Sequence, residues 1–110
     1  MKRVISIGIA SLFALPSLGC VNERVQDIAT LEGDLTSGKV IYDGSCAGCH
    51  GKDGRGSGPV DLLEDPDGPD EEFIEIILYG EGNMPAYADQ LDDQEIADVV
   101  AHIRVTLSGQ

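Results

Sequence analysis

Apolar positions in the second half of the chain recur at the spacing of an α-helix. The clearest repeat lies in residues 92–107, and its apolar members are Ile96, Val99, Val100, Ile103 and Leu107. Asp92 stands three residues before Glu95, which is close to the spacing of a capping box, with Asp in the place of Ser or Thr. The pattern therefore predicts a closing helix that begins directly after Asp92.

Two earlier segments also have helical patterns. In residues 35–45 the predicted shared face consists of Leu35, Gly38, Ile41 and Tyr42. In residues 70–79 we expect Asp70 to cap the helix. The buried face of this second helix is predicted to consist of Phe73, Ile76, Ile77 and either Tyr79 or Gly80. No alternating strand pattern occurs, so the predicted fold class is all-α, with about three helices.

The segments around these helices read as loops and a linker. Glycines are dense in residues 46–58 and prolines interrupt residues 59–69, so we expect loop throughout. Such long loops are unusual in a compact domain unless something packs against them. Residues 20–34 are polar and mixed and are predicted to be a tether, although Val21, Val25 and Ile28 have weak helical spacing. The folded domain is expected to span residues 35–110.

The first 19 residues have the layout of a secretory signal peptide. Lys2 and Arg3 precede an uncharged, largely apolar run over residues 4–15, which Pro16 ends. A helix of that run would cover about 18 Å at ~1.5 Å per residue, whereas an apolar bilayer core is roughly 30 Å thick. The pattern therefore favours an exported protein, cut before Cys20, over a membrane-spanning one.

The junction at Gly19 and Cys20 resembles the lipobox of bacterial lipoproteins, in which the cysteine becomes a lipid-bearing N-terminus. Ser17 departs from this pattern, which prefers leucine there, and small residues at Ser17 and Gly19 also suit an ordinary signal peptidase. We expect a lipid on Cys20, since this accounts for the odd member of three cysteines. The predicted location is the periplasmic side of a bacterial membrane.

Composition and charge limit the possible partners. The 110 residues allow one small domain, and 20 acidic against 7 basic residues give a net charge of −13. Loss of residues 1–19 would leave 91 residues with a charge of −15. This acidity excludes an ordinary nucleic-acid binder, which presents basic groups to phosphates.

The charge is also unevenly distributed. Residues 57–103 contain 14 acidic residues and no Lys or Arg. This asymmetry predicts a dipole that steers the protein towards a basic patch on a partner. Acidic residues that only solvate the surface, or suit a saline habitat, would produce the same pattern.

The motif Cys46-Ala47-Gly48-Cys49-His50 is the C-x-x-C-H pattern of c-type haem attachment. Two thiols separated by two residues can each add to one vinyl group of a haem, forming two thioether bonds. The next residue, His50, can then offer its imidazole to the iron as an axial ligand. The motif predicts one covalently attached haem c, held by Cys46 and Cys49.

Other chemistries for this motif are weaker. A redox-active cysteine pair would be expected beside a βαβ pattern, which is absent. A zinc site would need a fourth ligand, from His102 or an acidic residue. A structural disulfide between residues three apart would close a very small loop and stabilise little.

Met84 is the candidate for the second axial ligand. It is the only methionine outside the predicted signal peptide, and Pro85 follows it in a loop with Gly80 and Gly82. A thioether is a competent ligand of haem iron, whereas a methionine that only fills the core is the alternative. His102, the other histidine, is expected to be a packing or surface residue.

Together these motifs resemble class I c-type cytochromes of the small bacterial, periplasmic kind. The resemblance covers residues 35–107 and rests on the helix at 38–42, the segments 46–51 and 56–59, the Met84 loop and the closing helix. It implies a fold of helices and glycine-rich loops around one haem. It also implies that the helices at 35–45 and 92–107 cross tightly at Gly38 and Tyr42. His102 stands where the family usually has an aromatic residue.

The resemblance also implies a contact that orients His50, and a function. The carbonyl of Pro59 is expected to accept a hydrogen bond from His50. The implied function is single-electron transfer between redox proteins, with no small-molecule substrate and no enzymatic activity. A dedicated electron-accepting subunit of a dehydrogenase, and a haem-based ligand sensor or peroxidase, remain as alternatives.

Overall fold

The computed structural model describes residues 22–56 and 68–108. Its elements are α2 (Glu23–Ala29), α3 (Leu35–Ser45), α4 (Ala47–His50), α5 (Asp70–Tyr79), α6 (Asp93–Ala101) and the π-helix η4 (His102–Leu107). The described residues form no β-strand, and Glu81 and Met84 form an isolated bridge. The predicted all-α class is confirmed. The predicted signal peptide, Cys20 and Pro59 lie outside the described residues.

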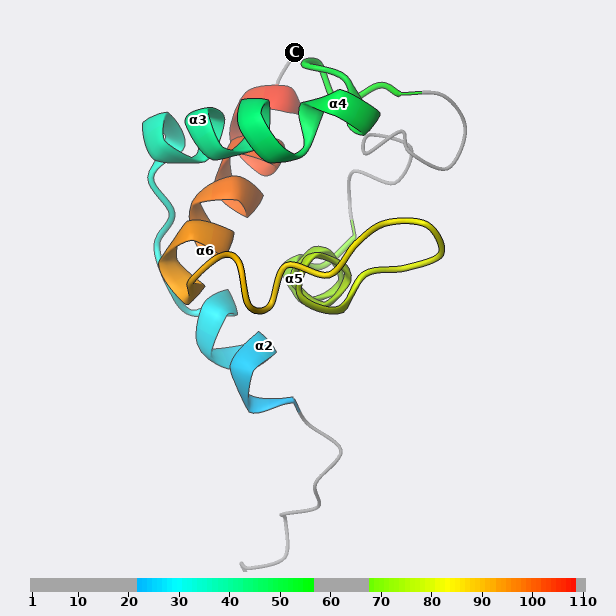
Figure 1. Cartoon of the computed structure of the whole chain (residues 1–110). Coiled ribbons are helices and arrows are strands. Elements are labelled where there is room, and N and C mark those ends of the chain that lie inside the picture. Colours follow the sequence, from blue (N-terminus) through cyan, green and yellow to red (C-terminus); the bar gives the residue numbers. More distant parts are fainter. Residues whose placement is uncertain (1–21, 57–67, 109–110) are drawn as a thin grey trace, which may run out of the picture.

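The centre of the fold is the crossing of α3 with α6 and η4 (Figure 1). Gly38 is buried at this crossing, and a Cβ atom there would collide with the carbonyl oxygen of Asp98. Only glycine allows the two helix backbones to approach so closely. Tyr42 lies one turn further along α3 and is fully buried. The crossing at Gly38 and Tyr42, implied by the family resemblance, is therefore confirmed.

Helix α5 has the predicted bounds but a partly different buried face. Its buried residues are Ile74, Ile77 and Leu78, whereas Tyr79 is 49% exposed. Of the predicted face, Ile77 is buried, and Phe73, Ile76 and Gly80 are half-buried, with Phe73 packed against the core. The burial of Ile74 and Leu78 was not predicted. Apolar residues surround most of this helix, so the sequence spacing alone does not select the face that packs on α2 and α6.

The predicted cap of α5 was also wrong. The N-cap residue is Pro69, which provides no side-chain hydrogen bond, and Asp70 is the first helical residue. The Asp70 carboxylate instead accepts a hydrogen bond of 2.7 Å from Nε of Arg104. A partner 34 residues away therefore holds the side chain that local sequence rules assign to capping.

The closing helix begins as predicted. The Asp92 carboxylate accepts from the backbone N–H of Glu95 at 2.8 Å, and the Glu95 carboxylate accepts from the Asp92 N–H at 2.9 Å. This is a complete capping box. From His102 onwards the helix widens into the π-helix η4, which the apolar spacing does not predict.

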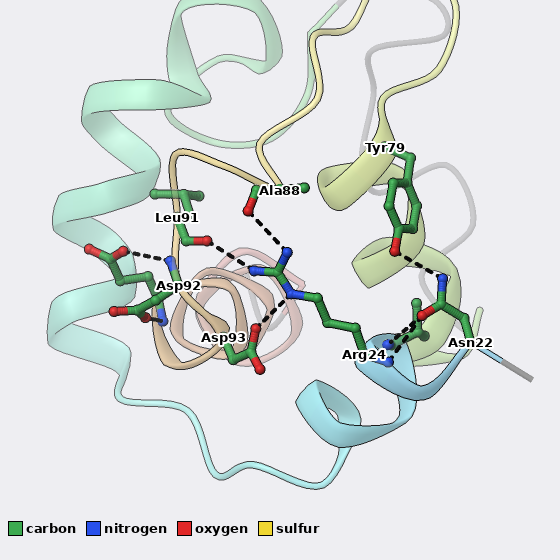
Figure 2. Close-up of polar contacts among 9 residues, drawn as sticks. Asn22, Arg24, Tyr79, Ala88, Leu91, Asp92 and Asp93 are labelled. Atoms are coloured by element: carbon green, nitrogen blue, oxygen red, sulfur yellow. Dashed lines mark hydrogen bonds and ion pairs between the residues drawn. The ribbon is translucent and has the colours of Figure 1, made fainter.

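The predicted tether at 20–34 is corrected by α2. Val25 and Ile28 are buried in the core, and Arg24 fixes the helix to the segment before α6 (Figure 2). The Arg24 guanidinium donates from Nε to Asp93 at 2.8 Å, from Nη1 to the Ala88 carbonyl at 3.0 Å and from Nη2 to the Leu91 carbonyl at 3.3 Å. Helix α2 is therefore an integral part of the domain.

The loop predicted over residues 46–58 contains the short helix α4. Gly51, whose φ is +81°, follows the helix, and its N–H donates to the Ala47 carbonyl at 2.8 Å. Glycine adopts a positive φ without the steric cost that other residues pay, so it allows the chain to leave the helix here. The described helices, α4 included, are all too short or too polar to cross a membrane.

Candidate functional site

The cysteines and the histidine of the C-x-x-C-H motif lie on a single helical turn. The backbone N–H groups of Cys49 and His50 both donate to the Cys46 carbonyl, at 3.2 and 3.0 Å. Cys46 and Cys49 are free thiols, so the disulfide alternative is not formed. Cys46 is half-buried and packs against the core, while Cys49 is exposed.

Burial also determines the state of the Cys46 side chain. It raises the pKa of the Cys46 thiol to about 11, so this group is neutral at pH 7. A thioether is likewise uncharged and suits the same apolar setting. A zinc site would need several protein ligands close together, and the described residues contain no group of three or more His, Cys, Asp and Glu placed to hold a metal ion.

Tyr42 supports the far end of the motif. Its hydroxyl donates to the Gly51 carbonyl at 2.6 Å, directly after His50. Burial raises the pKa of Tyr42 to about 12, so the hydroxyl keeps its proton and remains a donor at neutral pH. The carbonyl of Gly51 is therefore bonded to α3 through Tyr42, and its N–H is bonded to α4 through Ala47.

The Met84 loop turns sharply after α5. Gly80 and Gly82 both have positive φ, at +77° and +60°. A Cβ atom on Gly80 would lie 2.5 Å from the Met84 carbonyl oxygen, so the chain doubles back closely on itself there. Met84 donates its N–H to the Glu81 carbonyl at 2.9 Å, and its side chain is half-buried against the core.

Tyr87 connects this loop to the attachment segment. Its hydroxyl donates to the Ser45 carbonyl at 3.1 Å, one residue before Cys46. Its backbone N–H donates to Ile77 at 2.9 Å, which fixes the same loop to α5. This role of Tyr87 was not predicted from the sequence. The sequence feature that could have indicated it is a tyrosine, an aromatic residue with a polar hydroxyl, three positions after Met84.

The remaining predicted residues fall into three groups. Among the apolar positions of the helices predicted at 70–79 and 92–107, Ile77, Val99, Val100 and Ile103 are buried and Ile76 is half-buried. His102 is buried and packs against Tyr42, so its interpretation as a packing residue agrees with the structure. The roles expected for Pro59 and Cys20 fall outside the described residues.

The donor set fits a covalently attached haem. Two free thiols stand on one turn beside an imidazole, and a thioether lies in a loop that Tyr87 ties to the same segment. Thiols, imidazole and thioether are the groups that hold haem c and its iron. The apolar core against which Cys46 and Met84 pack would limit the access of water to such a group.

Comparisons with known proteins agree with this chemistry. Residues 33–103 match the family model described as cytochrome C oxidase, cbb3-type, subunit III. The chain is 39% identical over 88 residues to cytochrome c6 of Chlorolobion braunii, which covers 71% of this chain and 97% of that protein. It is 36% identical over 98 residues to cytochrome c-551 of Bacillus subtilis, which covers 86% of each.

A solved structure gives the same result for the fold. Cytochrome c6 from the diatom Phaeodactylum tricornutum superposes with a TM-score of 0.56 at 27% identity. The superposition covers 70% of this chain and 98% of that one. Residues 33–103, which match the family model, include the attachment motif, the Met84 loop and most of the closing helix.

Proposed function

The chain belongs to the c-type cytochrome family whose model is described as cytochrome C oxidase, cbb3-type, subunit III, and we propose that it carries single electrons on a haem ligated by His50 and Met84. It is a small class I cytochrome with one covalently bound haem c. In the proposal Cys46 and Cys49 form the two thioethers. In this proposal the protein is an electron carrier and not an enzyme.

One observation carries the ligand assignment. The Tyr87 hydroxyl joins the Met84 loop to Ser45, the residue before the attachment motif. This hydrogen bond directly connects the segment of Cys46 with the segment of Met84, although the two residues are 38 positions apart in the sequence. This contact supports Met84, rather than His102, as the second donor, since His102 packs inside the α3–η4 crossing.

The residues have distinct parts in electron transfer. The bound haem supplies an iron centre that gains or loses one electron. His50 and Met84 would occupy both axial positions, which leaves no position for a substrate and disfavours sensor or peroxidase chemistry. Tyr42 and Tyr87 hold the two segments that carry the proposed ligands. These ligands would therefore move little when the iron gains or loses an electron. The apolar core against which Cys46 and Met84 pack would limit the access of water to the haem and so would favour a higher reduction potential.

The acidic surface supports the proposal that the redox partner has a basic docking patch. Glu72, Glu75 and Glu81 are exposed on α5 and at the start of the Met84 loop. Carboxylates on this side would steer the protein towards a basic patch and would increase the rate of encounter. We expect electron transfer to slow as salt increases, and a rate that does not depend on salt would contradict this part of the proposal.

The proposed location is the periplasmic side of a bacterial membrane, with a lipid on Cys20. The support is the signal-peptide pattern of residues 1–19 and the lipobox-like Gly19–Cys20 junction. Mass spectrometry of the mature N-terminus tests the lipid directly. An unmodified Cys20 at the N-terminus would contradict the lipid anchor and leave an exported protein.

The central experiment is the absorption spectrum of the oxidised protein. We expect a far-red charge-transfer band from a thioether on ferric iron, and we expect Met84→Leu to lose it and to let carbon monoxide bind the ferrous form. Asn83→Ala, an exposed neighbour in the same loop, is the control and should keep the band. A band that survives in Met84→Leu would overturn the assignment.

Covalent attachment has a separate test. Haem bound through thioethers stays with the protein during acid–acetone extraction, whereas unattached haem is removed. Cys46→Ala combined with Cys49→Ala should release it, while Ser45→Ala removes only a hydroxyl beside the motif and should not. Extractable haem in the unaltered protein would contradict the role of both cysteines.

A further inference from the structure

His102 and Tyr42 form a buried pair behind the attachment segment. We propose that His102 is a positioning residue for this segment and acts through Tyr42. This inference rests on the proposed role of His50, because the effect of His102 is transmitted to the backbone next to that ligand.

The contact between the two rings is direct. Their centroids are 5.1 Å apart and their planes are inclined by 52°, a tilted arrangement of the kind that aromatic pairs favour. Tyr42 is 0% exposed and His102 is 3% exposed. The position of the tyrosine ring is therefore limited on this side by the imidazole.

The imidazole makes the fold less stable than an apolar ring of similar size would, so the contact that matters for positioning is that of the ring itself. Its Nδ1 atom is buried and has no hydrogen-bond partner, and burying a polar atom without a partner destabilises a fold. Burial also lowers the pKa of His102, so the ring is neutral at pH 7. A phenylalanine would fill a similar space without this cost.

The helix geometry changes at the same residue. The π-helix η4 begins at His102, and π-turns within helices are frequent at functional positions. A Cβ atom on Gly38 would lie 3.1 Å from Cβ of His102, so α3 and the first residue of η4 are in very close contact. The position of His102 is therefore determined by the backbone on both sides of the crossing.

Tyr42 transmits this position to the motif. Its hydroxyl donates to the Gly51 carbonyl at 2.6 Å, and the His50 carbonyl directly before it accepts from the Gly56 N–H at 2.9 Å. A tyrosine ring that shifts will weaken or move the bond to Gly51. The backbone of His50, and with it the direction of its imidazole, then becomes less constrained.

The test measures reduction potential in a set of variants of the holoprotein. His102→Leu removes the ring but keeps apolar volume, and Tyr42→Phe removes the bond to Gly51. We expect both to lower the potential, because looser packing admits water and stabilises the more highly charged ferric state. The double variant should shift no further than Tyr42→Phe alone, and His102→Phe should restore most of the original potential.

The control is Arg24→Met, which removes the contacts of α2 with Asp93 and with the carbonyls of Ala88 and Leu91 and leaves the side chains of the apolar core unchanged. It should lose stability without shifting the potential, which separates positioning from general destabilisation. An unchanged potential in His102→Leu, additive shifts in the double variant, or no restoration by His102→Phe would each overturn the proposal.

A failure of the ligand assignment gives a different result. Unaltered protein would then lack the far-red thioether band, whatever residue stands at position 102. The unfolding free energies of His102→Leu, Tyr42→Phe, the double variant and the unaltered protein still measure the coupling between His102 and Tyr42. Additive losses of stability there would overturn the proposal, and non-additive losses support the contact on which it depends.

Discussion

Tyr87 donates a hydrogen bond from its hydroxyl to the Ser45 carbonyl at 3.1 Å, and this bond joins the loop that carries Met84 to the segment that carries Cys46. Backbone hydrogen bonds from Tyr87 and Ala88 to the end of α5 hold the same loop from the other side. The loop is thus fixed at its base, while its tip contains two glycines with positive φ.

Tyr87→Phe tests this connection. The variant keeps the ring and loses one hydrogen bond, so we expect the free energy of unfolding to fall by about 1 kcal/mol. We also expect the far-red band to disappear at a lower denaturant concentration than global unfolding, because the loop opens more easily. Tyr79→Phe, which changes an exposed tyrosine hydroxyl on α5, is the control. Equal effects of the two substitutions on the band would contradict a specific role for Tyr87.

Gly38→Ala tests the helix crossing. The added methyl group would collide with the backbone carbonyl of Asp98, and neither backbone can move without separating α3 from α6. We expect a loss of about 2 kcal/mol or more in the free energy of unfolding. Gly44→Ala in the same helix has open space around the new methyl group and should raise it by roughly 0.5 kcal/mol. A tolerated Gly38→Ala would contradict the tight crossing.

Arg24→Met tests whether α2 belongs to the domain. The variant loses the ion pair to Asp93 and two hydrogen bonds to carbonyls, and we expect a loss of about 1–2 kcal/mol. Amide hydrogen exchange should accelerate in α2 more than in α3. Lys39→Met breaks an exposed pair with Asp43 and should change stability by less than about 0.5 kcal/mol. An unchanged exchange rate in α2 would contradict the role of Arg24.

Stability should depend on pH through His102. Burial, with a smaller effect from Lys39, lowers the pKa of the folded-state imidazole below 6.5, although Asp43 opposes this. Well above pH 6.5 the group is neutral in both states and changes nothing. As the pH falls below 6.5 the unfolded chain binds the proton first, so stability decreases until the folded-state pKa is passed.

The measurement is chemical denaturation at a series of pH values. The difference in stability between His102→Phe and the unaltered protein isolates the histidine from the many carboxylates that titrate at lower pH. We expect this difference to grow as the pH falls through the window below 6.5. A difference that stays constant over that window would contradict a lowered pKa for His102.

Local sequence rules predicted the elements whose structure depends on near neighbours. The bounds of α3 and α5 and the capping box at Asp92 follow from apolar spacing and from groups three residues apart. The attachment motif is also local, since one turn of α4 holds Cys46, Cys49 and His50 together.

The features that were missed depend on distant partners. Helix α2 has only two buried residues, and Arg24 bonds to groups 64 to 69 residues away. The Asp70 carboxylate joined Arg104 instead of capping its own helix. The role of Tyr87 rests on a carbonyl 42 residues earlier. Spacing in the sequence contains no information on such pairs, because the chain has to fold before they meet.

Proton NMR of the reduced holoprotein is the most direct test of the ligand pair His50 and Met84. A methionine methyl group bound to the iron lies above the face of the macrocycle, whose ring current shifts its three-proton resonance far upfield. We predict this resonance in the unaltered protein and in Asn83→Ala, and its loss in Met84→Leu. Its absence from the unaltered protein, or its survival in Met84→Leu, would contradict the account.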